Sequence, residues 1–205
     1  MRLKLFCLLV LFIVLPAGAQ VPQGQTILIL GDSLSAAYGM QVSESWPSLL
    51  QARLDEEGYG WRVFNASITG DTTQGGLSRL PRLLENQQPG LVLIELGGND
   101  GLRGLPLEVT RNNLADMIGK SRAAGAEVIL SEIHIPPNYG PVYTQRFNAI
   151  FHELAAEQGV TLLPFLLEDV ALEPGMMQND GVHPTAAAQP VILDAVWEVM
   201  APMLP

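Results

Sequence analysis

The sequence has 205 residues, of which 48% are hydrophobic and 16% are charged, and its formal net charge is −10. This length and composition are typical of a single globular domain and exclude an intrinsically disordered chain. The negative charge argues against nucleic acid or anionic membrane surfaces as partners, because both are negatively charged themselves.

The first 19 residues have the three parts of a secretory signal peptide. Arg2 and Lys4 form a basic start, an apolar run covers residues 5–15, and the small residues Ala-Gly-Ala precede Gln20. The run is shorter than the roughly 20 apolar residues that span a bilayer, with a retained N-terminal anchor as the alternative. We therefore expect a signal peptide over residues 1–19, cleavage after Ala19, and a periplasmic or secreted domain over residues 20–205.

Cleavage would change both the charge and the thiol content of the chain. Loss of the positive charges of Arg2 and Lys4 takes the formal charge from −10 to −12, and Cys7, the single cysteine, lies in the removed segment. Disulfides, a thiolate nucleophile and cysteine-based zinc sites are then excluded. We expect a mature monomer that needs neither a metal nor another cofactor.

After Gln20, short apolar runs alternate with amphipathic segments. In chain order we expect strand 26–30, helix 45–57, strand 62–66, helix 74–86, strand 91–96, helix 108–124, strand 127–131, helix 143–158, strand 160–165 and helix 185–200. The last helix contains Pro190, so a break or bend is expected there. This alternation predicts an α/β fold with a parallel sheet covered by helices on both faces. Such sheets bind ligands beyond the carboxyl ends of their strands.

Polar residues follow the first three expected strands. Ser33 follows the first strand within Gly-Asp-Ser, where its hydroxyl would be presented at the sheet edge; a helix cap is the alternative. Gly70 follows the second strand and could offer its N–H group, and Asn99 follows the third and offers an uncharged NH₂ donor. Taken alone, each of these segments also fits an ordinary turn.

A turn near the C-terminus contains Asp180 and His183, three positions apart. A carboxylate on Nδ1–H would fix the imidazole tautomer and leave Nε2 free to accept a proton, although a surface turn with an incidental histidine is the alternative. His152 lies inside an expected helix, and His134 follows the fourth strand with no acidic partner evident nearby in sequence. Together the four segments supply the nucleophile, base, orienting acid and oxyanion donors that acyl transfer requires.

These four segments resemble the signature blocks of the SGNH, or GDSL-type, hydrolase family. Ser33, Gly70, Asn99 and His183 match the four residues that give the family its name, and Asp180 matches the acid of its triad. The resemblance implies that Ser33, Asp180 and His183 are catalytic. It also implies an oxyanion hole built from Ser33, Gly70 and Asn99.

A closer likeness extends over nearly all of residues 27–197, to the family's group of multifunctional acyl-CoA thioesterases, proteases and lysophospholipases. It is carried by the segments ILGDSLSAAYGM, WPSLL, NASITGDTTQGGLSRLP, LGGNDGLRG, PPNYG, LLPF and DGVHP. This likeness implies a flavodoxin-like, three-layer α/β/α sandwich with a five-stranded parallel sheet. It implies a periplasmic serine esterase that hydrolyses aryl esters, lysophospholipids and long-chain acyl thioesters.

The same likeness implies that residues 101–107 form a segment that moves over the acyl chain, although its glycines also fit a static turn. The candidate substrate-binding residues are Gly101, Leu102, Leu105, Leu107 and Tyr139. Two alternatives stay open: a carbohydrate O-acetyl esterase of the same family, and a non-catalytic lipid-binding domain. A nucleotide-binding protein is disfavoured, because no glycine-rich phosphate loop follows the first strand.

Overall fold

A computed structural model describes residues 25–205, and the expected signal peptide over residues 1–19 lies outside this range. Five strands form one sheet in the order β2-β1-β3-β4-β5. Every neighbouring pair of strands is parallel. The strands are β1 (Thr26–Gly31), β2 (Arg62–Asn65), β3 (Leu91–Glu95), β4 (Glu127–Ser131) and β5 (Thr161–Leu163).

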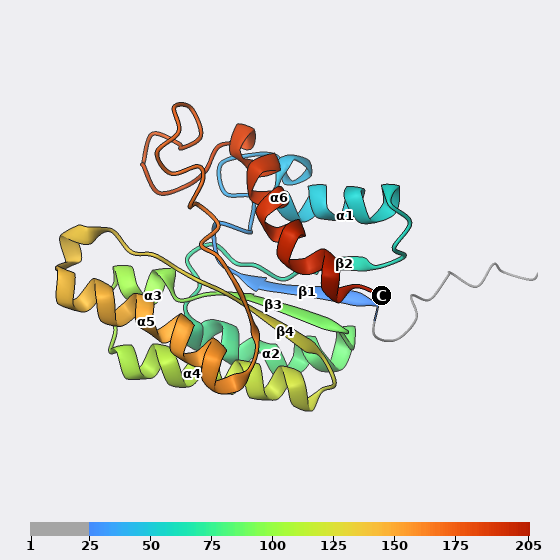
Figure 1. The fold of residues 1–205 in the computed structure, drawn as a ribbon, viewed down its shortest axis with the longest axis horizontal. Coiled ribbons are helices and arrows are strands. Elements are labelled where there is room, and N and C mark those ends of the chain that lie inside the picture. Colours follow the sequence, from blue (N-terminus) through green and yellow to red (C-terminus); the bar gives the residue numbers. More distant parts are fainter. Residues whose placement is uncertain (1–24) are drawn as a thin grey trace, which may run out of the picture.

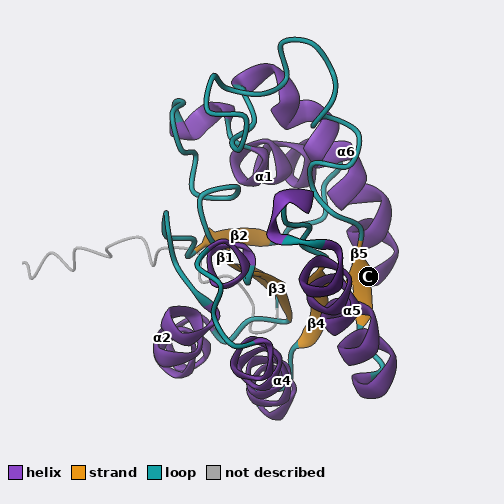
Figure 2. Ribbon diagram, turned by 90° about the vertical axis from the view of Figure 1, so that its left-hand side faces the viewer, coloured by secondary structure: helices purple, strands orange, loops and turns teal. Residues whose placement is uncertain are grey.

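Helices cover both faces of this sheet, as Figures 1 and 2 show. On one face lie α1 (Trp46–Glu56) and α6 (Gln189–Met200). On the other lie α2 (Thr73–Gln87), α4 (Leu107–Ala123) and α5 (Pro141–Gln158). The predicted three-layer α/β/α sandwich with a five-stranded parallel sheet is confirmed. None of the helices within residues 25–205 has the length and apolar character needed to cross a membrane.

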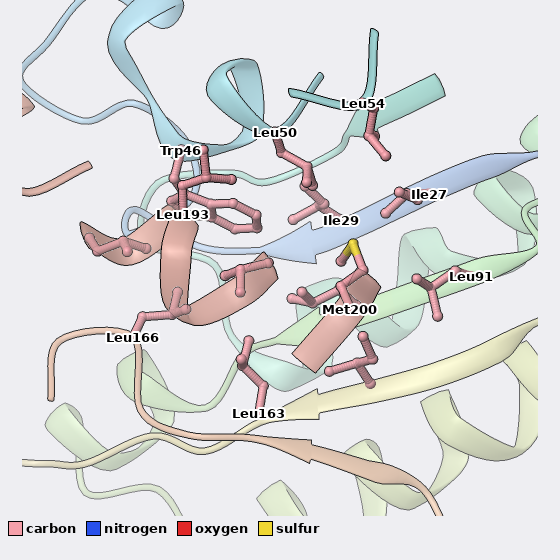
Figure 3. Close-up of a cluster of buried hydrophobic side chains, with 14 of the residues drawn as sticks. Ile27, Ile29, Trp46, Leu50, Leu54, Leu91, Leu163, Leu166, Leu193 and Met200 are labelled. Atoms are coloured by element: carbon pink, nitrogen blue, oxygen red, sulfur yellow. The ribbon is translucent and has the colours of Figure 1, made fainter. Parts of the chain in front are cut away.

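Side chains of the central strands alternate between two hydrophobic cores. Ile27 and Ile29 of β1 belong to the core under α1 and α6, whereas Leu28 and Leu30 belong to the core on the opposite face. Figure 3 shows side chains of α1 and α6 packed over β1 in the first of these cores. All four β1 side chains are fully buried, and each such burial contributes roughly 1.5–3 kcal/mol. The site-bearing loops thus follow a rigid sheet.

Most elements differ from the sequence-based expectation by one or two residues at an end, and three differences concern the physical cause of an end or the type of an element. Strand β5 ends at Leu163 rather than 165, because Pro164 cannot donate a ladder hydrogen bond. The expected final helix begins as a 3₁₀ turn over Ala186–Ala188, and α6 begins at Gln189. Pro190 therefore lies in the first turn of α6, where its missing N–H has no helical partner to lose. A short helix, α3 (Gly98–Leu102), was expected as a turn.

Candidate active site

The loops that follow the strands meet beyond the carboxyl ends of β1, β3 and β4, on the side where the arrowheads of Figure 1 point. They enclose a cleft of about 320 Å³. The apolar residues lining it are Leu34, Leu102, Ile133, Ile135, Pro136, Phe165, Leu167, Ala171, Met177 and Val182. Its polar lining includes Ser33, Asn99 and His183, so the candidate residues from three distant segments face one hollow.

Ser33, His183 and Asp180 form a continuous hydrogen-bonded chain. His183 Nε2 lies 2.9 Å from Ser33 Oγ, and His183 Nδ1 lies 2.7 Å from Asp180 Oδ2. Ser33 and His183 are 150 positions apart in the sequence, and the fold brings them together because β1 and the segment before α6 end at the same edge. An imidazole held between a hydroxyl and a carboxylate is the arrangement in which histidine can act as a general base.

The turn around Asp180 holds its carboxylate in the ionised form. Asp180 Oδ1 accepts hydrogen bonds from the backbone N–H groups of His183, at 3.0 Å, and Val182, at 2.9 Å. These bonds and the contact with the His183 ring lower the pKa of Asp180 to about 2. The ring of Tyr38 packs against the His183 ring with 4.2 Å between centroids. The imidazole is therefore held by the carboxylate at Nδ1 and by an aromatic ring at its side.

Ser33 lies in a tight turn immediately after β1. Asp32 builds this turn, because its carbonyl accepts from Ser35 N–H at 3.3 Å and its Oδ1 accepts from Leu34 N–H at 3.1 Å. The N–H of Ser33 itself makes no hydrogen bond with any residue from 25 to 205, and the same holds for the N–H of Gly70. Both groups are available to an incoming oxygen atom.

Asn99 lies in the first turn of α3, behind Gly97, whose φ of +122° suits glycine. Its Nδ2 donates to Asp32 Oδ2 at 2.9 Å, and its second N–H is left for another acceptor. Burial raises the pKa of Asp32 to about 6, although hydrogen bonds from Leu34 and Asn99 partly oppose this rise. The nucleophile turn and the Asn99 amide are therefore linked through one buried carboxyl group.

Among the candidate substrate-binding residues, Leu102 is the one that lines the cleft. Gly101 is buried, and an added Cβ there would lie 2.7 Å from Ile135 Cγ2. Tyr139 stands outside the cleft lining, but its hydroxyl donates to the Leu102 carbonyl at 2.8 Å. Leu105 also lies outside the lining, and Leu107 is the first residue of α4 and packs against the core.

The segment over residues 101–107, expected as one loop, is a loop only from Arg103 to Pro106, because its first two residues belong to α3 and its last to α4. Arg103 donates to the Gly70 carbonyl at 2.8 Å and so ties this loop to the turn after β2.

Several residues that line the cleft are not among the candidate site residues of the sequence. Ile133, His134 and Ile135 line the cleft from the loop after β4, and Phe165 does so from the loop after β5. Of these, His134 was expected near the sheet edge because it follows the fourth strand, and the structure places it in the cleft lining. The other three are ordinary core residue types, and their position after a strand was the available signal. Glu95 borders the cleft but is itself fully buried, and the available signal was a charged residue in an otherwise apolar strand.

The expectation that His134 has no nearby acidic partner is wrong. Glu132, two residues earlier, accepts hydrogen bonds on Oε1 from His134 Nε2 and His152 Nε2, both at 2.8 Å. The two histidines are held by one carboxylate because α5 packs beside the loop after β4. Within residues 25–205, no cluster of three or more His, Cys, Asp or Glu side chains is arranged to hold a metal ion.

Residues 29–190 match the GDSL-like lipase/acylhydrolase family. The chain is 52% identical over 185 residues to esterase TesA of Pseudomonas aeruginosa, an alignment covering 90% of this chain and 92% of the relative. It is 49% identical over 179 residues to thioesterase 1/protease 1/lysophospholipase L1 of Escherichia coli, covering 87% and 85%. A crystal structure of TesA superimposes with a TM-score of 0.85 at 53% identity, covering 88% of this chain and 100% of the other. The chain therefore belongs to the GDSL-like lipase/acylhydrolase family and is a carboxylic ester hydrolase.

Proposed function

We propose that this ester hydrolase acts through an acyl-enzyme formed on Ser33. The observation that carries the proposal is the contact chain Ser33 Oγ–His183 Nε2, at 2.9 Å, and His183 Nδ1–Asp180 Oδ2, at 2.7 Å. His183 takes the Ser33 proton as Oγ attacks the ester carbonyl, and then passes it to the leaving group. Water releases the acid by the reverse sequence, with Asp180 ionised throughout.

The charge that develops on the carbonyl oxygen needs donors that are not already occupied. The N–H groups of Ser33 and Gly70, free of partners within residues 25–205, and the second N–H of Asn99 are the proposed oxyanion donors. Each such donor is typically worth about 3–4 kcal/mol of transition-state stabilisation. Because Asp32 already holds one N–H of Asn99, this amide is oriented before the substrate arrives.

The cleft beside Ser33 supports an acyl chain as the bound part of the substrate. Its lining is mainly apolar and includes Leu102, Ile133, Ile135 and Phe165. Removing such a chain from water contributes about 0.8 kcal/mol for each buried CH₂ group. We therefore favour aryl esters, lysophospholipids and acyl thioesters over acetylated carbohydrates, which would need a polar, aromatic-lined groove.

A chain-length series tests this proposal directly. Residues 20–205 and their Ser33→Ala variant are assayed on p-nitrophenyl esters from acetate to palmitate, and then on a lysophospholipid. Hydrolysis of medium and long chains that is lost in the variant is the expected result. Activity confined to the acetate would favour carbohydrate deacetylation, and equal rates in the two proteins would eliminate Ser33 as the nucleophile.

We propose further that the enzyme acts outside the cytoplasm after removal of residues 1–19. The basic start, short apolar run and small residues before Gln20 support this location. N-terminal sequencing of the exported protein should begin at Gln20. An intact Met1 on a membrane-bound product would instead indicate a retained anchor.

A further inference from the structure

Glu95 is a fully buried carboxyl group directly behind the nucleophile turn. It is the last residue of β3 and pairs in register with Gly31, the last residue of β1. Its Oε2 accepts from the Asp32 N–H at 3.2 Å and from Ser35 Oγ at 2.8 Å. Asp32 and Ser35 flank Ser33, so one oxygen atom of Glu95 holds the turn on both sides of the nucleophile.

Gly31 leaves room for the Glu95 carboxyl group because it has no side chain. A Cβ on Gly31 would lie 2.6 Å from Glu95 Oε2 and 3.0 Å from Ser35 Oγ, so both of these side chains would have to shift to make room for it. Gly31 lies in the extended β1 strand, so its lack of a side chain, rather than an unusual φ angle, is what this position requires. The glycine of the Gly-Asp-Ser segment and Glu95 of β3 therefore form one steric unit.

The environment of the second carboxyl oxygen of Glu95 indicates that this group is in its neutral, protonated form. Oε1 is buried and has no hydrogen-bond partner among residues 25–205. An ionised carboxylate with an unpaired buried oxygen is costly, whereas a protonated one carries no charge. Burial, together with the nearby charge of Asp32, raises the pKa of Glu95 well above its usual range.

Asp32 is then the member of the pair that carries the negative charge at neutral pH. It receives hydrogen bonds from Leu34 N–H and Asn99 Nδ2, which stabilise an ionised carboxylate. The charged groups around it are His183, whose positive charge would favour ionisation, and Asp71, whose negative charge opposes it. Asp32 is in turn the charged group that faces Glu95.

On the basis of the proposed esterase reaction, we propose that Glu95, as a neutral carboxylic acid, is a positioning residue that fixes the nucleophile turn and, through Asp32, the Asn99 amide. Glu95 does not touch the reacting atoms. Its effect falls on kcat, because the positions of Ser33 and Asn99 decide how well the transition state is held. Substrate binding in the cleft is left nearly unchanged.

Two substitutions separate this role from general stability. Glu95→Gln is uncharged and keeps an acceptor for Asp32 N–H and Ser35 Oγ, so kcat on p-nitrophenyl butyrate at pH 7 should stay near the wild-type value. Glu95→Met has a similar length and no acceptor, and kcat should fall by about 10²-fold at an unchanged KM, the effect of a roughly 1 Å misplacement. Leu54→Ala, in α1 at the opposite end of the sheet (Figure 3), is a control that lowers stability without reaching this turn.

The pH profile adds a readout that a purely structural role would not change. Wild-type kcat should decline on the alkaline side as Glu95 ionises, and Glu95→Gln should lack this decline. The neutral-acid role would be overturned if kcat of the wild type and of Glu95→Gln declined identically on the alkaline side. It would also be overturned if Glu95→Gln lost as much kcat as Glu95→Met. A Glu95→Met variant with wild-type kcat would overturn the positioning role, and if this variant does not fold, the Glu95→Gln profile decides.

Failure of the underlying proposal gives a different result. If the wild-type enzyme forms no acyl-enzyme on Ser33, the Ser33→Ala variant should hydrolyse esters at the wild-type rate. This comparison does not involve Glu95, so failure of the proposed function is distinguishable from failure of the positioning role.

Discussion

Replacing Asp32 by asparagine should change how the stability of the protein depends on pH. Burial raises the pKa of Asp32 from 3.8 to about 6, so the folded protein holds this proton more tightly than the unfolded chain does. A rise of about two pKa units corresponds to about 3 kcal/mol. For a raised pKa, the stabilising contribution is complete below the unfolded value and is lost as pH rises through the folded value. The wild type should therefore lose about 3 kcal/mol between pH 4 and pH 8 from this group.

The assay is urea unfolding of both proteins across this pH range, followed by circular dichroism. Asp32→Asn loses one of the bonds to Leu34 and Asn99, which costs about 1 kcal/mol, but it escapes the cost of ionising a buried acid. The unfolding free energy of Asp32→Asn should thus rise relative to that of the wild type as pH increases. Its kcat should be lower than the wild-type kcat. Asp116→Asn, on the exposed face of α4, controls for the loss of one negative charge. A difference between wild type and Asp32→Asn that stays constant with pH would refute this reasoning.

Three further substitutions have expected outcomes. Asp180→Ala should lower kcat by about 10⁴-fold with little change in circular dichroism, and a loss below tenfold would argue against an orienting role. Gly31→Ala should reduce the unfolding free energy by about 1–3 kcal/mol in urea titrations, because its Cβ would lie 2.6 Å from Glu95 Oε2. An unchanged urea midpoint would show that the turn can accommodate the added methyl group. Leu54→Ala should lower the free energy of unfolding by about 2–5 kcal/mol and leave kcat unchanged. A fall in kcat of the folded variant would contradict the view that this part of the core does not affect the site.

The fold could be predicted because its strands are short apolar runs of the right length. The run over residues 26–30 reads as a buried strand, and the structure adds only Gly31 to it. The predicted elements differ from the structure where the hydrophobic pattern of the sequence disagrees with the backbone chemistry of individual residues. The apolar character of residues 160–165 suggested a longer strand, but Pro164 ends the ladder after Leu163. The five residues of α3, rich in glycine and asparagine, carry no helical periodicity to detect.

The parts of the site that could be predicted are local in sequence or follow strands. Asp180 and His183 are three residues apart, so their contact needs only one turn. The Ser33–His183 contact spans 150 positions and was expected because the two segments together supply a nucleophile and a base and resemble the signature blocks of one family. The Glu132–His152 contact could not be inferred, since the two residues lie 20 positions apart on elements whose packing the sequence does not specify.

Glu95 escaped prediction for a different physical reason. The run over residues 91–96 is apolar apart from Glu95, so it predicts a buried strand and gives no indication of what this one carboxyl group does. The function of a carboxyl group in such a run depends on which backbone and side-chain donors face it. Here these donors come from the turn after β1, 60 or more positions away in sequence.

Covalent labelling of Ser33 tests the central claim most directly. Residues 20–205 are incubated with diethyl p-nitrophenyl phosphate, and the modified peptide is located by mass spectrometry. The reagent transfers its phosphoryl group to a serine that has been activated by a general base. The predicted result is one diethylphosphoryl adduct on Ser33, absent from the Ser33→Ala variant and slowed in Asp180→Ala. An adduct on another residue, or no adduct in an enzyme that hydrolyses esters, would contradict Ser33 as the nucleophile.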